Sequence, residues 1–93
     1  MIMDMREQPI LCDYFIVCSA PSSVRVKTIA DAIEEELERE STKPQHKEGY
    51  SDGLWVLLDY GDVVVHVFHE ETRRFYELEN LWGDVPKKTF HHT

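Results

Sequence analysis

The sequence predicts an α/β fold, a single domain in which a mixed β-sheet of about five strands has helices packed on it. Two strand-like apolar runs, Leu54–Leu58 and Val63–Phe68, are separated only by a short stretch rich in turn formers. A segment with helical periodicity lies between these runs and an earlier apolar run, Tyr14–Cys18. The chain has 93 residues, 42% of them apolar, which is enough for one modest core and leaves no room for a second domain.

The two later apolar runs are predicted to form a tight β-hairpin. They are rich in Val, Leu, Trp and Phe, which suit a pleated surface, and turn-forming residues bound them. A turn centred on Gly61 would pair Trp55 with Val67, Leu57 with Val65, and Asp59 with Val63. The opposite face would then carry Leu54, Val56, Leu58, Val64, His66 and Phe68. Because both faces are largely apolar, each needs a covering layer.

A long helix is expected to begin at Ser22 or Ser23, whose side-chain oxygen can cap an N–H group of the first turn, and to end near Glu40. Its apolar positions recur at helical spacing and form one face, made of Val26, Ile29, Ala30, Ile33 and Leu37. The acidic outer face is either simply solvated or offered to a basic partner.

Shorter elements complete the prediction. A first strand is expected within Met1–Arg6 and a short edge strand within Gln45–Tyr50. A second helix is expected from Glu70, with Gly83 as its C-terminal stop. The last residues, Lys87–Thr93, show no pattern and are expected to form a loose tail.

Charge and apolar run length restrict the function. A net charge of -8 repels phosphate backbones and anionic lipids, so direct nucleic-acid binding by charge is not expected. The apolar runs are far shorter than the ~20 residues of a membrane helix, and no secretory leader is visible, which predicts a cytoplasmic protein without membrane contact. Cys12 and Cys18 are too far apart on one extended run to form a disulfide and should be free thiols.

No constellation in the sequence supports catalysis or metal binding. His66 and His69 have a spacing that puts them on opposite faces of a strand, which does not suit a metal site. Asp59 and Asp62 flank a turn, where aspartate is favoured for capping its own backbone, although such acids can also face a partner's Lys or Arg. No glycine-rich phosphate loop and no nucleophile elbow is present. We therefore expect no enzyme activity, no metal and no cofactor.

Aromatic side chains are concentrated in one part of the chain and suggest a protein interface. Six of them fall within a short stretch, namely Trp55, Tyr60, Phe68, Phe75, Tyr76 and Trp82. Core packing explains most of these positions. A sheet that is apolar on both sides, with few helices to cover it, nevertheless predicts an exposed aromatic patch, a common anchor for a partner or for a second copy of the chain.

The sequence resembles the ribosomal silencing factor family, also called Iojap-like. The resemblance covers nearly the whole chain and is carried by Asp13-Tyr14-Phe15, Ile29-Ala30-Asp31, Glu48-Gly49, the run Trp55–Phe68, the run Arg73–Glu79 and Leu81–Asp84. It implies a single Iojap-like domain over residues 1–93, without the amphipathic helix that usually precedes the first strand in members. It also implies a nucleotidyltransferase-like sheet that lacks an active site.

The resemblance further implies a partner and a mode of action. Members bind large-subunit ribosomal protein number fourteen, block association of the small and large ribosomal subunits and so repress translation; some act in large-subunit assembly instead. On this hypothesis Trp55 is the central anchor and the partner-binding residues are Trp55, Leu57, Asp59, Tyr60, Asp62, Val65, His66, Arg73, Tyr76 and Trp82. The alternatives that stay open are an assembly factor, a nucleotidyltransferase-type enzyme and a self-associating homodimer.

Overall fold

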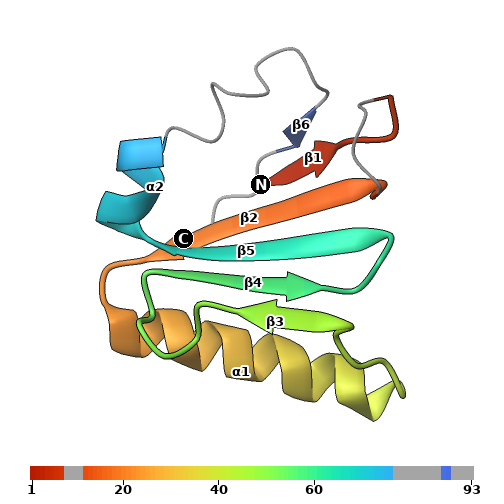
Figure 1. Ribbon diagram of the computed structural model, residues 1–93, viewed down its shortest axis with the longest axis horizontal. Coiled ribbons are helices and arrows are strands. Elements are labelled where there is room, and N and C mark those ends of the chain that lie inside the picture. Colours follow the sequence, from red (N-terminus) through yellow and green to blue (C-terminus); the bar gives the residue numbers. More distant parts are fainter. Residues whose placement is uncertain (8–11, 77–86, 89–93) are drawn as a thin grey trace.

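The computed structural model describes residues 1–7, 12–76 and 87–88 of the chain, which form a mixed sheet with helices packed on it (Figure 1). The elements in chain order are β1 (Ile2–Asp4), β2 (Tyr14–Ala20), α1 (Ser23–Arg39), β3 (His46–Glu48), β4 (Trp55–Asp59), β5 (Val63–His69), α2 (Glu70–Tyr76) and β6 (Lys87–Lys88). The predicted α/β class and the predicted order of elements are confirmed. None of the described helices is long and apolar enough to cross a membrane.

The sheet has six strands in the order β3-β4-β5-β2-β1-β6. β2 and β5 lie in the middle and pair in parallel over seven residues of each strand, whereas all the other pairs are antiparallel. The β2–α1–β3–β4–β5 segment returns the chain to β2, and α1 covers one face of the sheet on the way (Figure 1). α1 leaves the opposite face of the sheet uncovered.

Local sequence fixes both ends of α1. Ser22 has an extended backbone and its hydroxyl oxygen accepts a hydrogen bond from the N–H of Arg25 at 3.2 Å, as the sequence predicted for the N-cap. At the other end Ser41 adopts a φ of 62°, and its N–H bonds the carbonyl of Glu38 at 2.9 Å. Val26 and Ala30 are the fully buried residues of the helix and seat it on the sheet.

Two apolar clusters lie on opposite faces of the sheet. The cluster beneath α1 contains Ala20, Val26, Ala30, Val56, Leu58, Val65 and Val67. The cluster on the other face contains Met3, Met5, Cys12, Phe15, Val17 and Phe68, with Met1, Trp55 and Val64 packed against it. Burial on both faces explains why the hairpin strands are apolar throughout rather than alternating. Cys12 and Cys18 are free thiols, as predicted.

The hairpin register differs from the predicted one by one residue. β4 and β5 pair Trp55 with Phe68, Leu57 with His66, and Leu58 with Val65, so the predicted pairs of Trp55 with Val67 and Leu57 with Val65 are wrong. The turn contains two residues, Gly61 and Asp62, and is closed by a hydrogen bond from the N–H of Tyr60 to the carbonyl of Val63 at 2.9 Å. The prediction placed a three-residue loop around Gly61. Because side chains alternate along a strand, this slip moves every β5 side chain to the other face.

The predicted loose tail needs a correction at its first two residues. Lys87 and Lys88 form β6, which pairs with Met3 and Ile2 of β1 in antiparallel fashion. A two-residue strand is too short to show any periodicity in the sequence, but it satisfies backbone groups at the edge of β1. The remainder of the tail lies outside the described residues.

Gly49 and Gly61 provide a matched test of backbone constraint. Both have positive φ, 78° and 88°, but a Cβ on Gly49 would overlap the backbone carbonyl of Trp55, whereas the nearest atom to a Cβ on Gly61 is in the flexible side chain of Gln45, at 3.1 Å. We expect Gly49→Ala to lower the free energy of unfolding by about 3 kcal/mol or more, and Gly61→Ala by about 1–2 kcal/mol from the backbone alone. Urea unfolding of both variants checks this order, and equal losses would contradict it.

Candidate functional site

The candidate site is the sheet face that α1 leaves uncovered, at the end of the sheet formed by β3, β4 and β5. Trp55, Leu57 and Asp59 alternate along β4 on this face, and their partners on β5 are Phe68, His66 and Val64. Trp55 and Leu57 are half-buried, in contrast to the fully buried Val56 and Leu58 that face α1. We call the surface formed by Trp55 and Leu57 the Trp55 face.

Aromatic contacts hold Trp55 in place. Its indole stacks on the ring of Phe68 with centroids 4.8 Å apart and an interplanar angle of 29°. Its Nε1–H donates a hydrogen bond to Nδ1 of His66 at 3.1 Å, and His66 in turn meets the ring of Phe15 edge-on at 4.6 Å. Stacking and hydrogen bonding together leave the indole little rotational freedom.

His66 orients Trp55 and is not itself a surface contact, because its side chain is only 4% exposed. Burial lowers the pKa of His66 to about 4, so the ring is neutral at physiological pH. The bond from Trp55 requires Nδ1 to be the unprotonated acceptor, which places the ring hydrogen on Nε2. Nε2 has no hydrogen-bond partner among the described residues.

The two predicted acids lie at the hairpin turn. Oδ1 of Asp59 accepts a hydrogen bond from the N–H of Gly61 at 2.8 Å, which confirms its expected role in capping the turn. The backbone carbonyl of Asp62 accepts bonds from the N–H groups of Asp13 and Tyr14, at 2.7 and 3.1 Å, while its side chain is exposed. The turn is therefore tied to the start of β2 and carries carboxylates at the edge of the Trp55 face.

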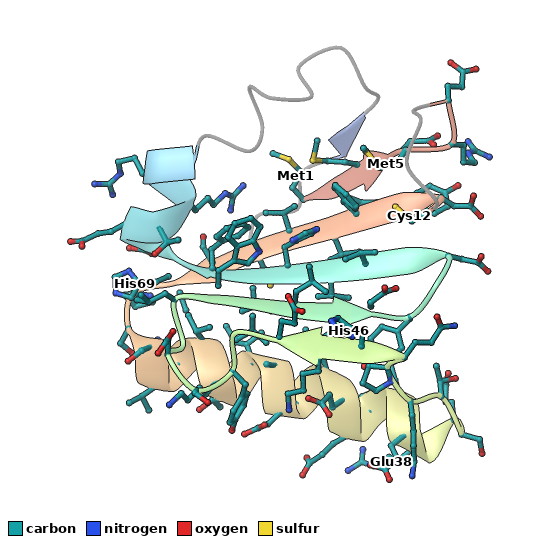
Figure 2. All side chains as sticks on the ribbon, viewed as in Figure 1. Met1, Met5, Cys12, Glu38, His46 and His69 are labelled. Atoms are coloured by element: carbon teal, nitrogen blue, oxygen red, sulfur yellow. The ribbon has the colours of Figure 1, made fainter. Side chains whose placement is uncertain are left out.

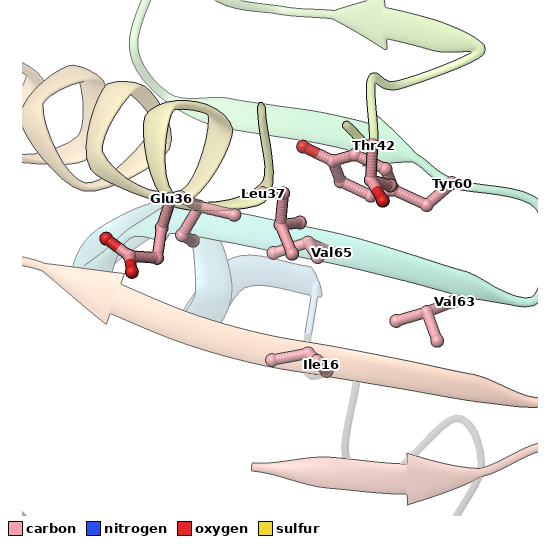
Figure 3. A pocket seen from close by; sticks show the side chains of 8 residues that line it. Ile16, Glu36, Leu37, Thr42, Tyr60, Val63 and Val65 are labelled. Carbon is pink, nitrogen blue, oxygen red and sulfur yellow. The ribbon is translucent and has the colours of Figure 1, made fainter. Parts of the chain in front are cut away.

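Two predicted partner-binding residues lie on the face that α1 covers. Val65 is only 3% exposed beneath α1, and Tyr60 packs against the same cluster. Both line an apolar groove of about 520 Å³ beside the C-terminal half of α1, together with Ile16, Ile33, Glu36, Leu37, Thr42 and Val63 (Figure 3). The structure thus separates both residues from Trp55. Val65 lies on the other face because the register of β5 differs from the predicted one, and Tyr60 does so because it is an odd number of residues from Trp55 along the chain.

The remaining predicted residues belong to α2 and beyond. Arg73 lies on α2, and its Nη1 donates a hydrogen bond to Oγ of Ser19 at the end of β2, at 3.1 Å. Tyr76 is the last residue of α2, but its side chain lies outside the described part of the structure, as does Trp82.

The histidines that the structure describes, His46, His66 and His69, do not converge on a metal site. His46 lies on β3 and His69 at the end of β5, well apart from one another (Figure 2). Nδ1 of His69 accepts a hydrogen bond from the N–H of Glu71 at 3.2 Å, so this ring caps the start of α2. Within residues 1–7, 12–76 and 87–88, no three His, Cys, Asp or Glu side chains are grouped so that they could hold a metal ion.

A hollow beside Trp55 was not predicted from the sequence. It has a volume of about 230 Å³ and is lined by Glu48, Gly49, Trp55 and Leu57. The sequence placed Glu48 and Gly49 within the predicted edge strand Gln45–Tyr50, but the position of the pair beside Trp55 depends on the pairing of Glu48 with Leu57 across β3 and β4. That pairing puts the Glu48 side chain on the Trp55 face.

Comparisons with known proteins agree on one family. The whole chain, residues 1–93, matches the family model described as "Ribosomal silencing factor during starvation". The chain is 42% identical over 84 residues to "Ribosomal silencing factor RsfS" of Bacillus subtilis, an alignment that covers 90% of this chain and 71% of the relative. It is 34% identical over 72 residues to "Protein Iojap, chloroplastic" of Zea mays, covering 77% of this chain and 31% of the relative.

Solved structures support the same fold. A crystal structure of a Chromobacterium violaceum protein superposes with a TM-score of 0.85 at 33% identity, covering 100% of this chain and 77% of the other. A crystal structure of a Bacillus halodurans protein gives a TM-score of 0.78 at 33% identity, covering 95% of this chain and 83% of the other. The predicted fold class is therefore shared with experimentally determined structures.

The buried neutral His66 predicts an acid sensitivity. Its pKa is about 4 in the folded chain and about 6.5 when unfolded, so the unfolded state binds more protons between these values and stability falls as pH drops through this window. The full effect is about 3 kcal/mol. Urea unfolding at pH 7 and pH 4.5 should show a loss that His66→Gln, which is neutral at both values, largely lacks. Identical losses in the two proteins would contradict the role of His66.

Proposed function

Because the chain belongs to the ribosomal silencing factor family, we propose that it binds large-subunit ribosomal protein number fourteen through the Trp55 face and blocks association of the two ribosomal subunits. The family consists of ribosome-binding regulators that are not enzymes, so the prediction that the chain has no catalytic activity is confirmed by membership. The nucleotidyltransferase alternative is removed on the same ground.

The proposal rests mainly on the indole of Trp55, which is fixed in one orientation by its neighbours and is still partly exposed to solvent. Stacking on Phe68 and the bond to His66 fix the ring before any partner arrives, while the residue remains half-buried rather than enclosed. Interface anchors are typically such aromatic side chains, because a rigid ring buries a large area at a small cost in conformational entropy. Leu57, next to it on β4, extends the apolar area.

Charge favours a basic protein as the partner. The chain has 18 acidic and 10 basic side chains, and the resulting charge of -8 repels ribosomal RNA while it accelerates encounter with a basic ribosomal protein. Asp59 and Asp62 stand at the hairpin tip beside the Trp55 face, where they can meet Lys or Arg. Tyr60 and Val65 are not part of this surface, since they lie on the α1 side.

In this proposal, the bound domain blocks subunit association by its location on the large subunit and not by a chemical reaction. A domain bound to a large-subunit protein at the contact area with the small subunit excludes the small subunit sterically, and this requires affinity and correct placement but no catalytic group. Action in large-subunit assembly would use the same contact on immature particles. Relatives include bacterial, chloroplastic and mitochondrial proteins, and for this chain we propose the bacterial cytoplasm.

Replacement of the anchor tests the proposal. We expect Trp55→Ala to weaken binding to isolated large subunits from Bacillus subtilis by at least about thirtyfold, which corresponds to about 2 kcal/mol for loss of a buried interface tryptophan. Cosedimentation across a range of subunit concentrations measures the change. Trp55→Phe, which keeps the stacking on Phe68 but loses the bond to His66, should show an intermediate loss.

The matched control is Val24→Ala on α1. Val24 is an apolar residue that is 72% exposed on the helix covering the other face, so its removal should leave binding unchanged. Circular dichroism must show that all variants keep the native fold. Unchanged binding of a folded Trp55→Ala variant would falsify the anchor assignment, and binding to small subunits instead of large ones would reject the proposed partner.

A further inference from the structure

The hollow beside Trp55 has the lining of a site for one cationic side chain. Glu48 lies directly across from Leu57 in the β3–β4 register, so the carboxylate and the leucine share a face. Trp55 forms another wall, and the fourth lining residue, Gly49, has no side chain to occupy the space. A volume of about 230 Å³ is below the roughly 300–1,000 Å³ of small-molecule pockets, which favours a single side chain as occupant.

The position of Gly49 keeps this hollow open. Its φ of 78° and the close approach of its backbone to the Trp55 carbonyl exclude any larger residue. The chain therefore passes tightly against the β4 backbone and leaves the space between the Glu48 carboxylate and the indole empty of protein atoms. The same constraint fixes the distance between the two walls, because it ties the end of β3 to the start of β4.

The Glu48 carboxylate is available to a cation. Its Oε1 lies 2.6 Å from Nε2 of the exposed His46, and its side chain remains 65% exposed. This contact uses one carboxylate oxygen of Glu48, so the second oxygen can accept a hydrogen bond from an incoming cation. Lys47, between these two residues, points to the opposite face, where its Nζ pairs with Glu34 of α1 at 2.5 Å, so it does not neutralise Glu48.

We infer that the hollow between Glu48 and Trp55 receives a lysine or arginine side chain of the protein that docks on the Trp55 face, an inference that rests on the proposed function. The aliphatic stem of the incoming side chain packs on Leu57, its charge pairs with Glu48, and its head lies against the indole, where a cation is attracted to the aromatic face. Glu48 then adds charge selectivity to the affinity that Trp55 supplies.

Charge variants of Glu48 test the inference by cosedimentation with large subunits from Bacillus subtilis. We expect Glu48→Gln to weaken binding about three- to tenfold, and Glu48→Lys to weaken it further because a repulsion replaces an attraction. Binding of Glu48→Gln should also depend less steeply on salt concentration than wild-type binding. The matched control is Glu35→Gln, the same change of charge on exposed α1, which should alter binding less than twofold.

The outcomes distinguish this inference from the docking proposal. If Trp55→Ala abolishes binding while Glu48→Gln and Glu48→Lys bind like the wild type, the docking face stands and the cation site is wrong. Tighter binding of Glu48→Gln would show an apolar occupant and would also overturn the inference. If Trp55→Ala binds normally, the docking proposal fails and the inference fails with it. Glu48 is exposed, so loss of fold does not complicate its variants.

Discussion

The two-residue turn at Gly61 and Asp62 is the constraint on which the faces of the sheet depend. It pairs Leu57 with His66, and the period of two along each strand then assigns every side chain of β4 and β5 to one face or the other. A loop one residue longer would exchange Val65 and Val67 with His66 and Phe68, placing an imidazole under α1. The positive φ of Gly61, at 88°, makes the short turn possible, because such a turn twists with the strands it joins.

With this register, the two faces of the sheet differ in composition and in how they are packed. The buried side chains beneath α1 are small or branched apolar groups, and they form the core on this side of the sheet. The other face concentrates the aromatic groups, with Phe15, Trp55 and Phe68 arranged around His66. Trp55 can remain partly exposed because the burial that maintains the fold is shared between both faces of the sheet rather than depending on the Trp55 face alone.

The sequence predicted the elements better than their pairing. Strong local signals, such as the Ser22 cap and the helical spacing of Val26 and Ala30, gave the correct helix, and the apolar runs gave the central strands. The hairpin register could not be predicted, since Asp59–Asp62 allows a two- or a three-residue loop and both faces are apolar, so hydrophobic patterning does not discriminate. The hollow at Glu48 could not be predicted for a related reason, because it depends on the register between β3 and β4.

The stability of the aromatic cluster does not by itself explain why a histidine occupies position 66. A phenylalanine would suit the aromatic cluster, whereas the imidazole leaves a buried Nε2–H without a partner among the described residues, at a cost of roughly 1–3 kcal/mol. What the imidazole provides is an acceptor for the indole N–H, 3.1 Å away, which fixes the direction in which Trp55 faces. Locally unfavourable residues are expected at functional sites, where orientation matters more than stability. The cost of burying His66 therefore supports the assignment of Trp55, and not of its fully buried neighbours, as the residue that meets the partner.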